Sequence, residues 1–328
     1  MKLLVFEYSS VYLDNSLFSE GFNMLKCVLD DLDDSAFEVY YLINDSLDTL
    51  NYTNSTAIPL DTNLMDWLNE NCQFYDCCLF IAPEDNLIQY SITRILEKSG
   101  VTIFGCDSVS SYICASKDLT YNHVSNDILK IPSVKLNRNE STYDLICKNF
   151  NKNDFIIKPD NRTSSDYIYH INDETEFDSC MKVYEKNSIE YFLAQEYIEG
   201  TPISASLICN NKYARCISIN SQEISIENNK IRYAGCKSPI HPPLEKEITE
   251  LSEKIVQQIK GLKGYVGIDY ILQEKLIYFV EINSRISTPY IVLQKNCNQN
   301  LTQSIIDSII NKNEIPRITF NNTGTFKK

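Results

Sequence analysis

The chain has 328 residues, of which 43% are apolar and 23% are charged, as is typical of a folded globular protein. The formal net charge of -14 argues against a nucleic-acid-binding face, because phosphate contacts need clustered Lys and Arg. No apolar run approaches the roughly 20 residues of a membrane span, and no signal-peptide cleavage site follows the start, MKLLVFEYSS. The 12 Cys residues are scattered without a CxxC pair, which favours reduced, buried thiols in a cytoplasmic protein.

The first hundred residues alternate between strand and helix patterns. Strands are expected at 2–8, 37–43, 76–83 and 101–105, and helices at 19–32, 64–71 and 85–100. Ser19 is the expected cap of the first helix, and Asp85 is either a helix cap or a residue at a ligand-binding sheet edge. The order predicts a small parallel sheet with helices on both faces. No GxGxxG follows the first strand, so a dinucleotide site is unsupported.

The pattern changes from about Val109 onward. A helix is expected around 111–127, then extended segments at 131–136 and 154–171, a helix at 174–187 and a strand at 190–198. After Gly200, antiparallel strands are expected to turn at Asn210 and Asn228. A helix at about 244–260, a β-hairpin and a terminal helix near 301–310 complete the predicted elements.

The predicted hairpin is GYVGIDYILQEKLIYFVEINSR, residues 264–285. Apolar residues alternate at even positions on both strands, so a single apolar face requires an odd loop, which we place at 273–275. In that register Asp269 lies opposite Phe279, while Glu281 and Asn283 follow on the same face. A two-residue turn would scatter these three polar side chains.

Asp269, Glu281 and Asn283 therefore form a candidate metal site, sheltered by Ile271, Ile277 and Phe279. Neighbouring sheltered carboxylates repel each other unless a cation neutralises them. Oxygen ligands without His or Cys suit Mg²⁺ better than zinc. The spacing alone fits an exposed hairpin edge with salt bridges equally well.

Two lysines and one strand are candidates for binding an anionic nucleotide. Lys158 ends the apolar strand FIIKP, where it meets an anion or simply extends its ammonium to solvent. Lys117 opens a helix, where positive charge is unfavourable unless an anion answers it. The segment AQEYIEG, residues 194–200, runs from a strand into a turn, where its backbone could pair with a purine edge.

The order of these pieces, ending in Glu-x-Asn-x-Arg at 281–285, resembles the ATP-grasp superfamily of carboxylate–amine ligases over essentially the whole chain. The resemblance implies an α/β (α+β) ATP-grasp fold behind an N-terminal pre-ATP-grasp parallel α/β domain. We expect that domain at 1–108, a central subdomain at 109–189, and a C-terminal subdomain with the metal hairpin at 190–328. The implied activity is ATP-dependent, ADP-forming amide synthesis through an acyl phosphate.

The resemblance also implies ATP and Mg²⁺ or Mn²⁺ as cofactors and assigns the candidate residues. Lys117 and Lys158 would bind the phosphates, Arg285 and Lys158 would be catalytic, and the metal ligands would be Asp269, Glu281 and Asn283. The adenine and ribose contacts would come from Gln195, Glu196, Tyr197, Ile198 and Glu199. A glycine-rich phosphate loop is replaced by DNRTSSD, where Arg162, Thr163, Ser164 or Ser165 would take its place.

Within the superfamily, stretches such as LLVFEYSS, QEYIEGTPISASL and VEINSRISTPY resemble the archaeal tyramine–L-glutamate ligases of methanofuran biosynthesis. That resemblance implies small-molecule substrates, a carboxylate and an amine, with neither nucleic acid nor membrane as partner and homo-oligomerisation left open. Arg215, Arg232 and Lys237 are candidates for the glutamate α-carboxylate. The alternatives are another amino-acid ligase, similar to the lysine–ornithine ligase of pyrrolysine synthesis, and a nucleotide-binding protein without turnover.

Overall fold

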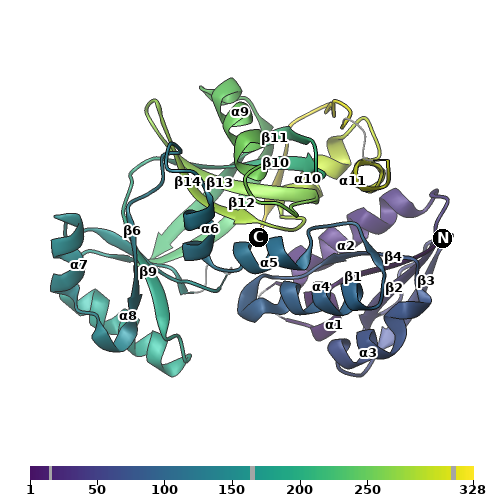
Figure 1. Cartoon of the computed structure of the whole chain (residues 1–328), viewed down its shortest axis with the longest axis horizontal. Coiled ribbons are helices and arrows are strands. Elements are labelled where there is room, and N and C mark those ends of the chain that lie inside the picture. The colour runs from purple at the N-terminus through teal and green to yellow at the C-terminus, as the bar shows by residue number, and fades with distance from the viewer. Residues whose placement is uncertain (15–16, 163–166, 312–314) are drawn as a thin grey trace.

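The computed structural model describes residues 1–14, 17–162, 167–311 and 315–328, and a smaller N-terminal sheet lies beside a larger second sheet (Figure 1). The N-terminal part is a parallel sheet of order β3-β2-β1-β4-β5. Its strands are β1 (Lys2–Glu7), β2 (Glu38–Asn44), β3 (Ser55–Leu60), β4 (Cys77–Ile81) and β5 (Thr102–Ile103). The predicted parallel sheet is confirmed. The sequence missed β3, whose STAIPL pattern contains a proline and lacks a clear apolar alternation.

Helices cover both faces of this sheet. They are α1 (Tyr8–Tyr12), α2 (Phe18–Leu32), α3 (Leu64–Asn71) and α4 (Ile88–Lys98), with short 3₁₀ turns at Cys72–Phe74 and Asp85–Leu87. Leu3 of β1 packs in the cluster that contains α2, whereas Leu4 packs in the one that contains α3 and α4. The predicted caps are wrong, because Leu17 and Leu87 occupy the N-cap positions of α2 and α4 and neither makes a side-chain cap.

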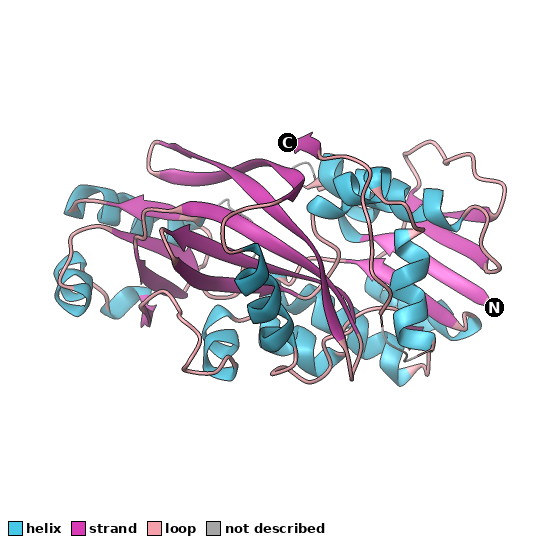
Figure 2. Cartoon of the chain, turned by 90° about the horizontal axis from the view of Figure 1, so that it is seen from above, coloured by secondary structure: helices cyan, strands magenta, loops and turns pink. Residues whose placement is uncertain are grey.

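The rest of the chain builds a second, mostly antiparallel sheet of order β14-β13-β10-β11-β12-β8-β7-β9-β6, with β15 paired to β12 (Figure 2). Its strands are β6 (Ser133–Asn137), β7 (Phe155–Pro159), β8 (Tyr169–Ile171), β9 (Tyr191–Glu196), β10 (Thr201–Cys209), β11 (Ala214–Glu227), β12 (Lys230–Ile240), β13 (Gly264–Gln273), β14 (Leu276–Asn283) and β15 (Gly324–Lys327). The predicted turns at Asn210 and Asn228 both occur.

Seven further helices accompany this sheet among the described residues. They are α5 (Ser108–Cys114), α6 (Lys117–His123), α7 (Tyr143–Phe150), α8 (Glu174–Lys186), α9 (Glu245–Val256), α10 (Pro289–Asn296) and α11 (Leu301–Ile310), with a 3₁₀ turn at Arg138–Glu140. The single helix expected around 111–127 is in fact two, because the chain leaves the helix at Ala115 and Ser116 and Ser116 caps α6. The sequence missed α10.

The second sheet has two hydrophobic cores. One lies around β7, β9, α7 and α8, and the other around β10, β13, β14 and α9. The tip of the β11–β12 hairpin joins them, since the His170 N–H donates to the Asn229 carbonyl at 2.8 Å and the Ile231 N–H donates to the Ile168 carbonyl at 2.9 Å. The division of the chain into domains at 108/109 and 189/190 stays a proposal. Strand β9, which follows the second boundary, pairs with β6 and β7, which precede it.

The hairpin of β13 and β14 turns over two residues, Glu274 and Lys275, so the predicted three-residue loop is wrong. An extra residue on β14, Val280, then shifts the register and places Asp269 directly opposite Glu281. The bulge keeps the polar residues together but changes their neighbours. Ile277 and Phe279 pack in the core, while Val280 lines the cavity, the reverse of the predicted faces.

The sequence predicts neither a membrane span nor disulfide bonds. In the parts of the chain that the structure describes, no helix is both long and apolar enough to cross a bilayer. All twelve cysteines are unpaired and most are buried, as the sequence predicts.

Candidate active site

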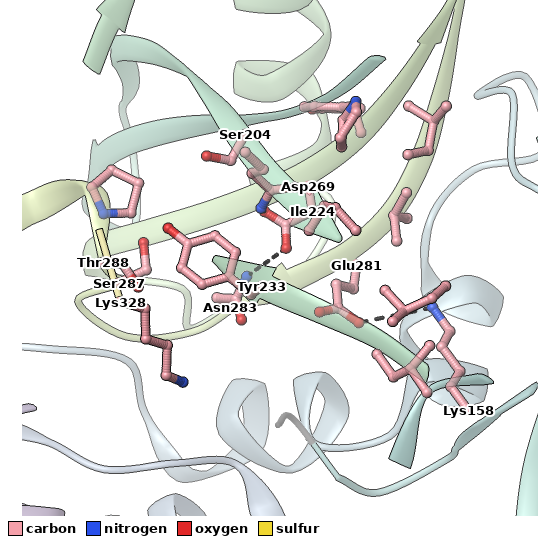
Figure 3. Close-up of a pocket in the computed structure, with 18 of the residues that line it drawn as sticks. Lys158, Ser204, Ile224, Tyr233, Asp269, Glu281, Asn283, Ser287, Thr288 and Lys328 are labelled. Atoms are coloured by element: carbon pink, nitrogen blue, oxygen red, sulfur yellow. Dashed lines mark hydrogen bonds and ion pairs between the residues drawn. The ribbon is translucent and has the colours of Figure 1, made fainter. Parts of the chain in front are cut away.

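A cavity of about 470 Å³ opens between the carboxyl edge of the parallel sheet and the second sheet. The ends of β1 and β4, strands β7 and β11 to β14, and the segment after β9 all contribute to its walls. Carboxyl edges of parallel strands commonly face ligands, since successive loops leave the sheet there. Figure 3 shows Lys158 and Lys328 on opposite sides of Asp269, Glu281 and Asn283. The cavity therefore has a cation at each end and oxygen ligands between.

Part of the cavity lining is apolar, and we call this part the apolar slot. It consists of Ile131, Ile156, Ile168, Ile198, Ile224, Ile226, Ile231, Ile271 and Val280. Apolar walls of this kind suit an aromatic base. The predicted residues Gln195, Glu196, Tyr197 and Ile198 line the cavity, whereas Glu199 is exposed and does not.

Residues 195–197 are held by hydrogen bonds and by one contact between aromatic rings. The Gln195 amide donates to the Tyr121 hydroxyl at 2.9 Å and to the Ser133 hydroxyl at 2.7 Å. The Glu196 N–H donates to the Pro132 carbonyl at 3.0 Å. Tyr197 stacks on His170 with ring centroids 4.2 Å apart. These contacts hold residues 195–197 in place.

Glu281 brings the two predicted lysines together. Its Oε2 lies 3.6 Å from Lys117 Nζ and 3.9 Å from Lys158 Nζ. Burial lowers the pKa of Lys158 to about 8, with Glu281 opposing and Lys117 adding to the effect. Burial by itself would raise the pKa of Glu281, but the two lysine cations outweigh it, and the pKa lies below its ordinary value. Glu281 therefore stays ionised.

Asp269 has a different environment from that of its neighbour. Burial and the charge of Glu281 raise the pKa of Asp269 to about 7. Asn283 donates to its Oδ2 at 3.2 Å, and Gln222, on β11, donates to its Oδ1 at 3.0 Å. Two adjacent, partly buried carboxylates and an amide oxygen form a set that a hard divalent cation fits, because it would relieve their repulsion. Among the described residues no group of three or more His, Cys, Asp or Glu forms a metal cluster, so this mixed set carries the metal prediction.

Asp160 lies at the N-terminus of α6, next to Lys117, the first residue of that helix. Its carboxylate accepts from the Ser116 hydroxyl and from the Asp118 N–H, each at 3.1 Å, and so adds a second acceptor at the N-terminus of α6, beside the Ser116 cap. Lys135 Nζ lies 2.7 Å from its Oδ2. Lys117 Nζ also donates to the Arg162 carbonyl at 2.6 Å. Negative charge from Asp160 and Glu281 offsets the unfavourable position of Lys117.

Arg285 is held by a residue of the N-terminal part. Its Nε donates to Glu84 Oε2 at 2.8 Å, and the other oxygen of Glu84 accepts from the Ser284 N–H at 3.0 Å. Glu84 is fully buried, so this contact fixes Arg285 in the cavity wall. Of the predicted phosphate-loop residues, Thr163, Ser164 and Ser165 lie outside the described residues, and Arg162 turns its guanidinium to the Asn187 carbonyl.

Several site residues were missed from the sequence. Gln222, Glu84 and Asp160 contact predicted residues from distant parts of the chain, and no local pattern marks them. Glu20 and Lys328 line the cavity as well. None of the three cations proposed for an α-carboxylate, Arg215, Arg232 and Lys237, is part of its lining.

Comparison with known proteins connects this geometry to a family. Residues 114–289, more than half of the chain, match the ATP-grasp domain. A tyramine–L-glutamate ligase of Methanocaldococcus jannaschii is 29% identical over 307 residues, 90% of this chain and 85% of that protein. A D-alanine–D-alanine ligase of Clostridium beijerinckii is 26% identical over 211 residues, 61% of this chain and 66% of that protein.

The fold agrees with the sequence comparison. A crystal structure of an ATP-grasp superfamily protein from Archaeoglobus fulgidus aligns with a TM-score of 0.73 at 23% identity, covering 100% of this chain and 92% of that one. The predictions of an ATP-grasp fold and of an ATP-dependent carboxylate–amine ligase are confirmed at the level of the family. The chain belongs to the ATP-grasp family.

Proposed function

We propose that the protein joins the γ-carboxylate of L-glutamate to the amine of tyramine, with ATP converted to ADP and phosphate. The observation that carries the ATP-dependent step is the cluster of Lys117, Lys158, Glu281 and Asp269 at the cavity wall, beside an apolar slot. The specific substrates rest on the similarity to a tyramine–L-glutamate ligase over 90% of the chain.

In this proposal the adenine occupies the apolar slot along Gln195, Glu196, Tyr197 and Ile198. The phosphates extend toward Lys117 and Lys158, whose charges favour bound anions in a site of low dielectric constant. Asp269, Glu281 and Asn283 would hold Mg²⁺ or Mn²⁺, which would neutralise the triphosphate and tie it to the hairpin.

The residues at the hairpin end then act on the acyl group. Arg285 is oriented by Glu84 and would bind the phosphoryl group during its transfer. A carboxylate oxygen of the substrate attacks the γ-phosphorus, the bond to the ADP oxygen breaks, and an acyl phosphate forms. The amine nitrogen attacks the acyl carbon, phosphate leaves with the C–O electron pair, and the amine loses one proton. Positioning and charge neutralisation suffice, and no Ser or Cys nucleophile is required.

The test is ADP release coupled to mass spectrometry of the products, with ATP, Mg²⁺, L-glutamate and tyramine against single-substrate controls. A γ-glutamyltyramine mass that needs both substrates is the expected result. ADP release with a different acid and amine, for instance lysine with ornithine or two D-alanine molecules, would retain the ligase chemistry and reject these substrates. Nucleotide binding without ADP release across the whole panel would reject the ligase itself.

A further inference from the structure

The end of the cavity at Lys328 contains an ion pair that has no role in the reaction described above. Lys328 Nζ lies 3.4 Å from Glu20 Oε2, and both side chains line the cavity. The Glu20 side chain is only 13% exposed, whereas that of Lys328 is 33% exposed, so Glu20 is sheltered and Lys328 is accessible to a ligand. Thr288 donates its hydroxyl to the other oxygen of Glu20. The pair therefore sits at a site of fixed geometry inside the cavity.

The position of Lys328 is set by the sheet. Its N–H donates to the Ala234 carbonyl at 2.9 Å, which continues the pairing of β15 with β12. Gly235 permits this approach, because a Cβ there would clash with the Phe326 carbonyl oxygen. In both views the C-terminal end of the chain lies between the two sheets (Figure 1, Figure 2). Lys328 is thus anchored as a cavity wall residue.

Glu20 is the acidic residue at this end that is arranged to meet a cation. Glu7 also lines the cavity, but its carboxylate accepts from the N–H and hydroxyl groups of Ser9 and Ser10 and caps α1. The charge of Glu20 also acts on Arg285, which lines the same cavity. The ion pair therefore lies near the place where the acyl group would react.

We propose that Lys328 and Glu20 form the subsite for the zwitterionic head group of the α-amino acid donor, with Lys328 facing its α-carboxylate and Glu20 its α-ammonium. The proposal rests on the proposed function, because it assumes a donor that reacts through a carboxylate other than its α-carboxylate. When a zwitterion binds, the ion pair between Lys328 and Glu20 is replaced by two ion pairs with the ligand. Every charge therefore keeps a partner of opposite sign. A ligand with only one of the two charges leaves Lys328 or Glu20 without one, at a desolvation cost.

Glutamate has two analogues that separate these contributions. Glutarate lacks the α-ammonium group, and 4-aminobutanoate lacks the α-carboxylate. Binding of L-glutamate and both analogues is measured by calorimetry in the presence of ADP and Mg²⁺, for the wild type and for Lys328→Gln and Glu20→Gln. Lys327→Gln is the matched control, since it removes the exposed neighbouring charge on β15.

The wild type is expected to prefer L-glutamate over each analogue by about tenfold. Lys328→Gln should abolish the preference over 4-aminobutanoate and keep the preference over glutarate, and Glu20→Gln should do the reverse. Equal weakening of all three ligands by either variant would indicate a structural role and overturn the assignment. So would wild-type protein that binds glutarate as tightly as L-glutamate, or that binds no L-glutamate.

The two proposals fail separately. If the binding pattern appears but no γ-glutamyltyramine forms, the subsite stands and the proposed reaction is rejected. If the product forms but the variants leave the selectivity unchanged, the reaction stands and the subsite is rejected.

Discussion

Asp269 lies directly opposite Glu281 in the hairpin, although the two-residue turn alone would place them on different faces. The bulge at Val280 restores the shared face, and it brings two partly buried carboxylates into adjacent positions. Such a pair costs stability in the absence of a bound cation, because each charge disfavours the other. Removing one of the two charges is therefore expected to make the ligand-free protein more stable and to impair its activity.

Asp269→Asn should raise the melting temperature of the ligand-free protein at pH 8 by roughly 2 °C. The amide removes a buried charge beside Glu281, and Gln222 can reverse its own amide to pair with the new NH₂ group. The same variant should lose ADP formation and the thermal stabilisation by ATP with Mg²⁺. Differential scanning fluorimetry with and without ligand measures both effects.

The pH dependence of that stabilisation has a definite sign. The pKa of Asp269 is raised to about 7 in the folded protein, so the cost of its charge is fully present only above that pH. The difference in melting temperature between variant and wild type should therefore shrink as the pH falls from 8 toward 3, below the ordinary pKa of an Asp carboxyl, where the group is mostly protonated in both the folded and the unfolded state. A difference that stays constant over this range would contradict the shift.

Lys158 makes ADP binding sensitive to alkaline pH. Burial lowers its pKa to about 8 in the ligand-free protein, so it loses its proton as the pH rises past that value. The affinity for ADP, measured by calorimetry in EDTA, should fall between pH 8 and 9.5. Lys158→Arg retains its charge over this range and should show no fall. If the ADP affinity of the two proteins changed with pH in the same way, the role of Lys158 in phosphate binding would be rejected.

Glu281→Gln should reduce the rate of ADP formation by about 10²-fold or more, because it removes a metal ligand and the anion shared by Lys117 and Lys158. Glu274→Gln is the matched control, at the exposed turn of the same hairpin. It should retain wild-type turnover. Circular dichroism of both variants checks that the fold is intact, and near-normal turnover of Glu281→Gln would reject the metal assignment.

Asp160→Ala should raise the KM for ATP about tenfold, because Asp160 holds the helix that carries Lys117. Loss of this acceptor at the N-terminus of α6 should also reduce the free energy of unfolding by about 1 kcal/mol. Asp173→Ala removes the carboxylate that accepts from an N–H at the N-terminus of α8, a helix that bears none of the cavity-lining residues. That control should lose similar stability without a change in KM, and an equal rise in both would refute the positioning role.

Gly235→Ala should weaken L-glutamate binding as Lys328→Gln does, because the added methyl group displaces β15. Gly105→Ala serves as the control glycine, since a Cβ there would meet only ordinary contacts. Calorimetry with L-glutamate and with ADP separates the effects, and ADP affinity should be unchanged. Unaltered glutamate binding in Gly235→Ala would show that Lys328 does not depend on this pairing.

The sequence determined the elements with strong local patterns and the family. The alternation of apolar strands and helices gave the parallel sheet, and the terminal helix α11 begins and ends where its apolar periodicity does. The order of Lys117, Lys158, Asp269 and Glu281 predicted one site, and the fold brings Lys117 and Lys158 to Glu281, which faces Asp269. Such side chains are recognisable because their chemistry requires particular residue types in a particular order.

The tertiary structure alone decided the hairpin register and the partners of the site residues. A single bulged residue at Val280 changes which side chains face the cavity, and alternation of apolar residues cannot specify a bulge. Gln222, Asp160 and Glu84 contact site residues that lie far from them in the sequence. Glu20 and Lys328 meet only because α2 and β15 border the same cavity. Pairings over such separations are set by the packing of whole elements, which no local pattern records.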